Sequence, residues 1–215
     1  MTSSWFSARQ VGSGVTDEFR FFAETGKKGY MPELVADLFV SVDGCARGSR
    51  SPAYFGFGGP DLDRWIREQM QRPQRHLMGR KTYEALAALP EPAHAEGSLS
   101  LSATSTTVFS RTLRAVSWPQ ATIAADLAGA VRRLKAEGTD LRIIGSLSLV
   151  RQLLGAGLID RLRLLVFPLI VGETGQEPAF AHLPDVALDL VGQSVLDGRI
   201  VLSEYRPSGP PPYAS

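Results

Sequence analysis

The sequence predicts an α/β protein with a mixed, mostly parallel sheet, helices on both faces and a C-terminal antiparallel hairpin. Strand-like apolar segments alternate with amphipathic helix-like segments between residues 34 and 167. Two later strand-like segments are joined by Asp197-Gly198, a typical hairpin turn. With 215 residues and 44% hydrophobic content, the chain can bury one full core, which favours a single domain.

The first half of the chain predicts alternating strands and helices. The predicted elements are a strand over 34–42, a helix over 60–71, a strand over 76–78, a helix over 82–89 and a strand over 107–109. The first strand is β-branched and apolar, which suits burial on both faces of a sheet, and it ends at Asp43-Gly44. Pro90 stops the second helix, and residues 91–105 are expected to form a loop.

The second half continues the alternation and then closes with the hairpin. The predicted elements are a helix over 126–136, a strand over 141–144, a helix over 146–154 and strands over 161–167, 187–196 and 200–205. Asp126 is the expected N-cap of its helix, because a carboxylate there can accept a hydrogen bond from a free N–H, and Gly138 ends that helix.

Both ends of the chain are predicted to lie outside the folded domain. Residues 1–30 mix Gly, Ser and charge without sustained periodicity and are interpreted as an N-terminal extension that we expect to be flexible. Met31 precedes the first convincing strand, so the domain is expected over 31–207. Residues 208–215, which contain PPP, are expected to be a disordered tail.

Composition argues against several classes of function. The net charge of +1 provides no broad positive face for nucleic acid. The single cysteine, Cys45, cannot form an internal disulfide, and no Cys/His spacing predicts a metal site. No apolar run approaches the roughly 18 residues that span a membrane, and no signal peptide is evident. We therefore expect a cytoplasmic protein that acts on a small molecule.

The clearest candidate site is the segment HLMGRKTYEAL. Here Gly79 follows a short strand and permits close backbone approach, and the cations Arg80 and Lys81 then enter a helix with Thr82. At the carboxyl end of a strand, such a helix start suits a phosphate group. The alternative is a plain turn followed by two solvated side chains.

Two other strand ends have similar chemistry. Gly145 and Ser146 start a helix after an apolar strand, where bare N–H groups and a hydroxyl suit a pyrophosphate. Taken alone, such a Gly-Ser start is more often ordinary helix capping. Ser110 and Arg111 follow the strand TVF, where an arginine can stack on a purine or pair with a phosphate, or simply occupy a turn.

Three acidic residues are also candidates. Asp43, with Gly44, follows the first strand and is expected either to line the site or to form a turn. Asp61 and Asp63 begin the first helix, where each is expected either to place a carboxylate near a substrate or, particularly Asp61 after Pro60, to cap the helix.

The ordered segments SVDG, MGRKTYEAL, TVFSRTL, IIGSLSLVRQLLGAGLID, LRLLVFPLIVG and VLSEYRP resemble the dihydrofolate-reductase-like superfamily, over about residues 32–207. More narrowly, the chain is similar to bacterial stand-alone relatives of the reductase domain of the riboflavin-biosynthesis deaminase/reductase. The resemblance implies the dihydrofolate-reductase-like fold and bound NADPH. It assigns Gly79 to Thr82 to the cofactor phosphates and places Ser110 and Arg111 near the 2′-phosphate.

The resemblance also implies roles for further residues. It places Gly145, Ser146 and Leu147 along the pyrophosphate and Val40, Ser41, Asp43 and Gly44 beside the nicotinamide. It assigns one acidic residue of the first helix to the substrate, but the register leaves Asp61 and Asp63 as alternatives. It also suggests a homodimer.

The function expected from this resemblance is hydride transfer from NADPH to a C=N or C=O bond of a small pterin-like, pyrimidine-like or related heterocycle. Two alternatives stay open, a riboflavin-pathway reductase and a non-catalytic NADPH-binding or interaction protein that keeps the fold. The chain lacks the D-x-P-x-L-x-x-R segment usual in riboflavin-pathway reductases, and its loop at 172–180 is longer than usual.

Overall fold

The computed structural model describes residues 30–89 and 101–214. The predicted N-terminal extension, apart from Tyr30, and most of the predicted 91–105 loop lie outside the described residues. The described residues from Met31 onward form one compact unit. Its strands are β1 (Leu34–Ser41), β2 (Cys45–Gly48), β3 (Arg75–Gly79), β4 (Thr106–Phe109), β5 (Ala121–Ala124), β6 (Leu141–Gly145), β7 (Arg161–Phe167), β8 (Gly175–Pro178), β9 (Ala187–Leu196) and β10 (Ile200–Gly209). Its α-helices are α1 (Pro60–Met70), α2 (Arg80–Ala87), α3 (Leu127–Ala136) and α4 (Leu147–Gly155).

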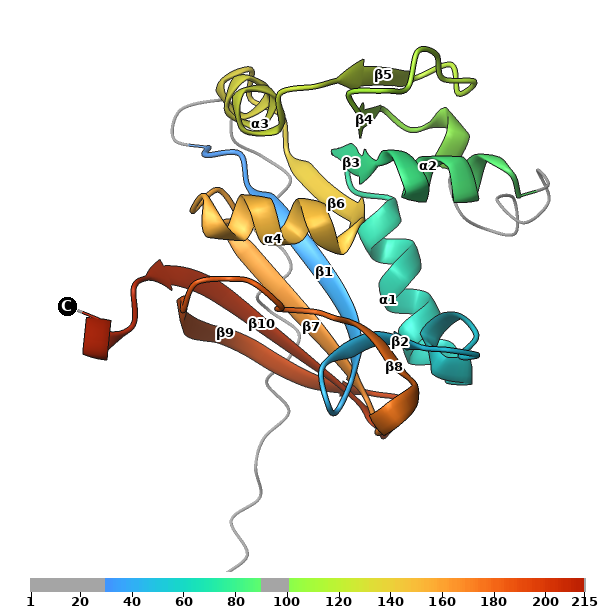
Figure 1. Cartoon of the computed structure of the whole chain (residues 1–215), viewed down its shortest axis with the longest axis vertical. Coiled ribbons are helices and arrows are strands. Elements are labelled where there is room, and N and C mark those ends of the chain that lie inside the picture. The colour runs from blue at the N-terminus through green and yellow to red at the C-terminus, as the bar shows by residue number, and fades with distance from the viewer. Residues whose placement is uncertain (1–29, 90–100, 215) are drawn as a thin grey trace, which may run out of the picture. The chain divides into compact units, whose positions relative to one another are not determined.

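The predicted fold class is confirmed. Eight strands form one sheet in the order β5-β4-β3-β6-β1-β7-β10-β9, and β2 pairs with β8 in a separate two-stranded sheet (Figure 1). The first six strands in this order, β5, β4, β3, β6, β1 and β7, run parallel to one another. β10 is antiparallel to both β7 and β9, so the C-terminal hairpin extends one edge of the sheet.

The helices cover the sheet on both faces. Leu34, Ala36, Leu38 and Val40 of β1 are buried in a cluster that includes residues of α3 and α4. Phe39, which points to the other face because side chains alternate along a strand, packs in a cluster with residues of α1. Residues of α2 pack on that same face, over β3 and β4. The face beneath α3 and α4 is therefore the main apolar core.

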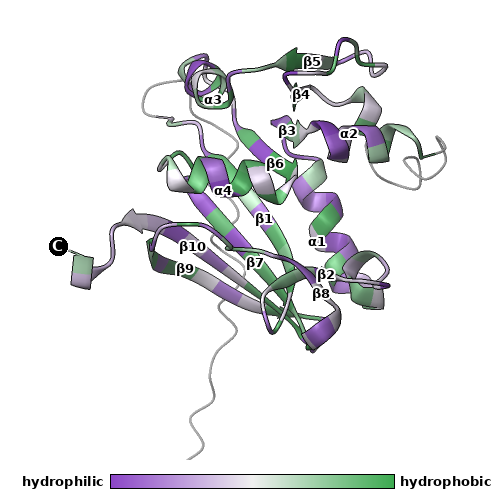
Figure 2. Cartoon of the chain, viewed as in Figure 1, coloured by the Kyte–Doolittle hydropathy of each residue, from purple (hydrophilic) through white to green (hydrophobic). Residues whose placement is uncertain are grey.

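The face beneath α1 also holds a polar cluster, which we define as Asp37, Arg142, Arg163, Gln69 and Glu204. Arg142 Nε donates to Asp37 Oδ2 at 2.7 Å, and the Asp37 side chain is only 2% exposed. Arg163 donates to Gln69 Oε1 at 2.7 Å and to Glu204 Oε2 at 2.8 Å. The Trp65 ring lies 5.8 Å from the Arg142 guanidinium. Hydrophilic bands across β6 and β7 are visible in Figure 2.

Three strands were not predicted, and their composition explains why. β2 and β8 read CARG and GQEP, which show no apolar alternation, and each pairs only with the other. β5 has four residues and joins the sheet through β4 alone. Their strand conformation depends on tertiary partners rather than on their own pattern.

Several element boundaries differ from the predicted ones by one residue, and two elements differ by more. Helix α2 begins at Arg80 rather than at residue 82. At the C-terminal end, where disorder was expected over 208–215, β10 continues to Gly209 and Pro212–Ala214 form a 3-10 turn. The Tyr213 hydroxyl donates to Asp185 Oδ2 at 2.6 Å, so this short segment has a partner within the domain.

Candidate functional site

A cleft of about 1020 Å³ opens at the carboxyl ends of β3, β4 and β6. This is the edge at which open α/β sheets place ligands. The cleft is lined by the turns after these strands, the starts of α2 and α3, much of α4, and one residue of β8. The lining includes seven of the residues that were predicted to bind the cofactor: Gly79, Arg80, Lys81, Ser110, Arg111, Ser146 and Leu147.

Two glycines bring two of the predicted phosphate segments together. A Cβ added to Gly79 would lie 2.9 Å from Ser146 Oγ, and one added to Gly145 would lie 3.0 Å from Thr82 Oγ1. Gly145 also has a φ of +150°, which side chains disfavour. Because β3 and β6 are neighbours, the starts of α2 and α4 meet side by side. Thr82 and Gly145 themselves do not line the cleft; they pack behind it.

Two of the three helix starts at the cleft, those of α2 and α4, have no side-chain cap from the described residues. Neither Gly79 before α2 nor Ser146 before α4 makes a side-chain capping bond. The N–H groups of a first helical turn have no partner within the helix, and the helix dipole makes this end positive. By contrast, Asp126 Oδ1 accepts from the Gly129 N–H at 3.0 Å and caps α3, as predicted. The starts of α2 and α4 are therefore suited to an anion.

The charged side chains of the cleft differ in how they are paired. Arg80 is bound to Glu84, with Nη1 at 3.1 and 3.0 Å from the two carboxylate oxygens. Lys81 and Arg111 make no hydrogen bond or ion pair with any residue in the described part of the chain. Arg151 Nε donates to the Ala179 carbonyl at 3.1 Å. Lys81 and Arg111 are thus the cations available to a ligand.

The segment that the resemblance places beside the nicotinamide is not part of the lining of this cleft. Val40, Ser41, Asp43 and Gly44 do not line the cleft. Ser41 Oγ accepts from the Cys45 N–H at 3.1 Å. Asp43 accepts from the N–H groups of Val171 and Gly172, at 3.2 and 2.9 Å. Hydrogen bonds from Ser41 and then from Gly172 hold the pKa of Asp43 below its usual value. These side chains fix the turn after β1 to the loop before β8.

The two candidate acids also lie away from the cleft. The Asp197 carboxylate accepts from the N–H groups of Asp61 and Leu62, at 2.9 and 3.0 Å, and so caps α1 from the hairpin. Asp61 in turn accepts from the Asp197 N–H at 3.1 Å and pairs with Arg64. Asp61 therefore does not cap α1 itself, as the alternative for Asp61 had it, because Asp197 is the capping side chain.

Asp63 is exposed and lies within electrostatic range of Tyr54. Burial raises the pKa of the Tyr54 hydroxyl, and the Asp63 carboxylate adds to that rise against the lowering effect of Arg142. The Tyr54 ring packs 5.1 Å from Phe39 on the α1 face of the sheet. The structure therefore places Asp63 within electrostatic range of the Tyr54 hydroxyl.

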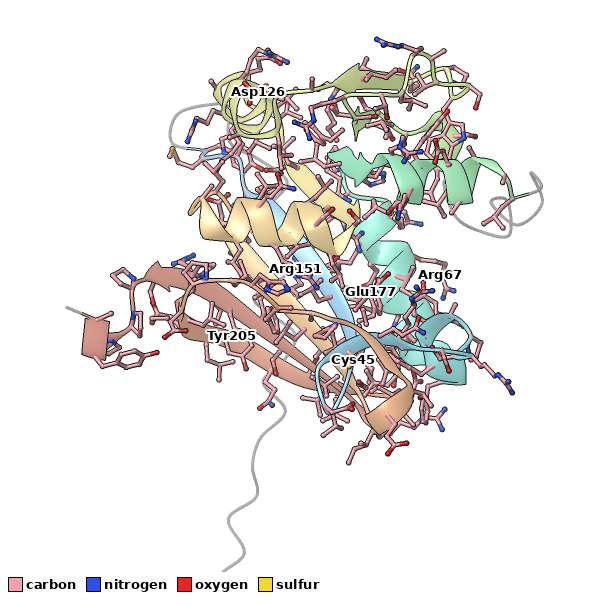
Figure 3. The ribbon with its side chains drawn as sticks, in the orientation of Figure 1. Cys45, Arg67, Asp126, Arg151, Glu177 and Tyr205 are labelled. Carbon is pink, nitrogen blue, oxygen red and sulfur yellow. The ribbon has the colours of Figure 1, made fainter. Side chains whose placement is uncertain are left out.

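Several residues that line the cleft were not predicted. They include Thr112, Asp126, Ser148, Arg151, Gln152 and Glu177. Ser148, Arg151 and Gln152 recur at helical spacing on α4, and this polar stripe was the available signal in the sequence. Glu177 had no such signal, because β8 was not predicted. In the view of Figure 3, Asp126 and Glu177 lie on opposite sides of α4.

The chain belongs to the family described as the RibD C-terminal domain, whose model matches residues 32–202. This match runs from just before β1 to Leu202, near the start of β10. A search of the curated proteins found no match.

Solved structures with the same fold support this placement. A putative riboflavin biosynthesis protein from Shewanella sp. PV-4 shares 18% identity, with a TM-score of 0.68, over 82% of this chain and 99% of that one. A pyrimidine reductase-like protein from Corynebacterium diphtheriae shares 18% identity, with a TM-score of 0.60, over 82% and 92%.

A third similar structure is a bifunctional enzyme. It is the diaminohydroxyphosphoribosylaminopyrimidine deaminase/5-amino-6-(5-phosphoribosylamino)uracil reductase from Thermotoga maritima, with 16% identity, a TM-score of 0.61 and coverage of 83% of this chain and 57% of that one. The family indicates a reductase. The neighbouring structures share the fold, which is the predicted dihydrofolate-reductase-like one. Among the described residues, no helix is long and apolar enough to cross a membrane.

Proposed function

We propose that this protein is an NADPH-dependent reductase whose cofactor binds in the cleft. The observation that carries the proposal is the meeting of two uncapped helix starts and two unpaired cations at one sheet edge. Phosphate groups are recognised by this combination of N–H groups, helix dipole and positive side chains. The family of reductases to which the chain belongs supports the same cofactor.

The residues present fit the parts of NADPH. The starts of α2 and α4 would hold the pyrophosphate, where Gly79 leaves room beside Ser146. Arg111, with Ser110, would hold the 2′-phosphate, since a free guanidinium can bind phosphate through two parallel hydrogen bonds. Arg80 already satisfies two of its donors with Glu84, so we assign it a secondary contribution.

The chemistry that the cofactor supplies when bound is a hydride for a C=N or C=O carbon of a small heterocycle. The protein must then orient that substrate and provide a proton. Asp63 stays our candidate on α1, because its carboxylate is exposed, whereas Asp61 is held by Asp197 and Arg64. We propose a pyrimidine-like substrate, which the names of the neighbouring structures support.

The second candidate is a non-catalytic NADPH-binding protein. Its supporting observation is that neither Asp61 nor Asp63 lines the cleft. The two functions differ in whether the bound cofactor is consumed.

The experiment has two parts that separate these functions. NADPH is titrated against the protein by fluorescence, and nicotinamide absorbance is then followed with dihydrofolate and with the riboflavin-pathway ribosylamino-pyrimidine as substrates. Binding followed by oxidation of NADPH supports the reductase. Binding without turnover of either compound or of a wider heterocycle panel supports the second candidate, and absence of binding contradicts both.

We also propose that the protein is a cytoplasmic homodimer. β9 is an edge strand, and one of its two sides pairs with no other strand of the described residues. Its Leu190 and Val195 are 60% and 58% exposed. Long apolar edges of this kind are usually covered in the native assembly. Light scattering at several protein concentrations should give twice the chain mass, and the mass of one chain would contradict the dimer.

A further inference from the structure

Arg151 lines the cleft from α4, and the reductase proposal above gives it no role. Its Nε donates to the Ala179 carbonyl at 3.1 Å, and its Nη2 donates to the Pro178 carbonyl. Pro178 is the last residue of β8, so the guanidinium joins the end of this strand to α4. In the view of Figure 3, Arg151 lies on the side of α4 where Glu177 of the same strand lies. Arg151 therefore acts between two elements rather than within its own helix.

The strand that Arg151 holds is not part of the main sheet. β8 pairs with β2, and the two form a separate sheet. The position of this small sheet therefore depends on contacts other than strand pairing with the main sheet. Just before β8, Asp43 accepts from the N–H groups of Val171 and Gly172. Together with Arg151, this contact fixes β8 at both of its ends.

Ala179 connects Arg151 to the turn after β1. Its carbonyl accepts from Arg151, and its N–H donates to the Gly44 carbonyl at 2.8 Å. Ala179 is only 1% exposed and belongs to the apolar cluster that contains residues of α4. Gly44 is part of the turn that the resemblance places beside the nicotinamide. Hydrogen bonds therefore run from α4, through one buried residue, to this turn.

The other end of this connection is the start of α4, which the reductase proposal assigns to the cofactor pyrophosphate. Leu147 and Ser148 precede Arg151 by one helical turn, so their side chains share one face of the helix with Arg151. All three residues line the cleft. One turn rises about 5.4 Å along the axis, and the hydrogen bonds within the helix keep this spacing fixed. A cofactor at the start of α4 is thus held at a set distance from Arg151.

The chemistry of arginine suits this link. A guanidinium carries five N–H donors in one rigid plane, so it can bind two successive carbonyl groups at once. Hydrogen bonds from a charged donor are also stronger than those between neutral groups. A lysine ammonium keeps the charge but lacks the planar fork. Lysine at this position is therefore a conservative variant that should retain only part of the link.

From these observations we propose that Arg151 is a positioning residue, which aligns the turn after β1 with the cofactor bound at the start of α4. This inference rests on the proposed function. Loss of the link leaves the phosphate contacts in place but lets β8 and Gly44 move relative to the nicotinamide. Because a small displacement of reacting groups lowers a rate strongly, reduction slows while cofactor affinity is retained.

The test compares the wild type, Arg151→Met, Arg151→Lys and Arg133→Met, all as the full chain. Arg151→Met keeps an apolar side chain and removes every donor. Arg133 is the matched control, because it is an exposed arginine of α3 that does not line the cleft. Hydrogen–deuterium exchange of the Ala179 amide in the free protein reports on the link. NADPH fluorescence gives the Kd, and nicotinamide absorbance with the ribosylamino-pyrimidine gives kcat and KM.

We expect the Ala179 amide to exchange at least about tenfold faster in Arg151→Met than in the wild type, as for the loss of a charge-assisted hydrogen bond. The kcat of this variant should fall by about 10- to 100-fold, while the Kd of NADPH changes by less than about twofold. Arg151→Lys should recover part of both losses, because one carbonyl keeps a charged donor. Arg133→Met should match the wild type in exchange, Kd and kcat.

Four results would overturn the positioning role. Unchanged Ala179 exchange in Arg151→Met would show that the arginine does not hold β8. A loss of NADPH affinity as large as the loss of kcat would make Arg151 a cofactor contact. A lower Tm with an unchanged kcat would leave it a purely structural role. NADPH binding by the wild type without turnover of any compound would leave no reduction to position.

The proposed function has its own, separate failure. It fails if the wild type does not bind NADPH. The exchange rates of the free wild type and of Arg151→Met then still decide whether Arg151 holds the turn after β1, because that measurement needs no cofactor.

Discussion

The cations beneath α1 and the cations of the cleft belong to the same sheet but have opposite surroundings. Arg142 and Arg163 are buried, with side chains 6% exposed, and bind Asp37, Gln69 and Glu204. Arg111 and Lys81 lie in the cleft and have no partner in residues 30–89 and 101–214. Burial of a charge is costly unless it is paired, whereas an open cleft leaves charge available to a ligand.

The helix starts repeat this contrast. The start of α1 is held by Asp197 and the start of α3 by Asp126, while α2 and α4 meet the cleft without a side-chain cap. A helix start or a cation therefore indicates a ligand site only where the structure shows that no side chain of the protein already binds it. The contrast also predicts that substitutions beneath α1 change stability, whereas substitutions in the cleft change cofactor binding.

The largest expected effect is on stability, from Asp37→Ala. This substitution leaves Arg142 and Arg163 buried without their shared carboxylate, and breaking a buried pair in this way costs about 3–5 kcal/mol. Urea unfolding measures the loss, and Asp37→Asn serves as the milder variant if Asp37→Ala does not fold. The Kd of NADPH for the folded fraction should not change, and a cost below about 1 kcal/mol would contradict the structural role.

The next effect is a pH dependence that arises from His76. Burial, and then the charge of Arg142, lowers the pKa of His76 from 6.5 to about 4. The unfolded chain takes up a proton near pH 6.5 and the native protein does not, so stability falls as the pH drops from about 6.5 to 4. The contribution is on the order of 3 kcal/mol.

Urea unfolding across this pH range, with His76→Gln for comparison, measures the contribution. The wild type should lose more stability than the variant between pH 6.5 and pH 4. Parallel curves would show that His76 is not held neutral.

In the cleft, Arg111→Ala should raise the Kd of NADPH by about 10- to 100-fold, because a charge-assisted hydrogen bond contributes about 1.5–3 kcal/mol to binding. NADH, which lacks the 2′-phosphate, should be affected much less. Arg114→Ala is the matched control, since Arg114 is exposed nearby and does not line the cleft. Fluorescence titration gives both Kd values, and equal losses for NADPH and NADH would remove Arg111 from the 2′-phosphate.

The smallest effect is expected from Asp197→Asn. Asparagine tolerates the left-handed turn at this position, where φ is +49°, but removes the negative charge and one of the two acceptor oxygens from the start of α1. The expected cost is about 1 kcal/mol in urea unfolding, with NADPH binding unchanged. Weaker NADPH binding at unchanged stability would instead connect the α1 start to the site.

The sequence was sufficient for the elements that carry their own pattern. The predicted bounds of β7 and β9 agree with the structure, and Asp126 caps α3 as expected. The three strand ends with glycine, hydroxyl and basic residues do meet in one cleft, because the parallel order of β4, β3 and β6 brings them together. Their roles toward NADPH stay predictions.

What the sequence did not provide depends on distant partners. Asp197 is separated from α1 along the chain, so its capping of Asp61 and Leu62 could not be recognised from local spacing. Arg151 and Glu177 enter the cleft through contacts between α4 and β8, a strand with no pattern of its own. The contrast between Arg80, which is paired, and Arg111, which is not, likewise required coordinates.

The strand order also constrains how the molecule forms on the ribosome. β1 is synthesised first, yet Leu34 pairs with Leu141 of β6 and Val35 with Arg161 of β7. β1, at the centre of the sheet, therefore has neither of its partner strands until β6 and β7 have emerged, whereas β3 and β4 can pair earlier. Since non-local strand pairing is slow and leaves strand edges open to other chains, β1 is the segment with the longest exposure during synthesis.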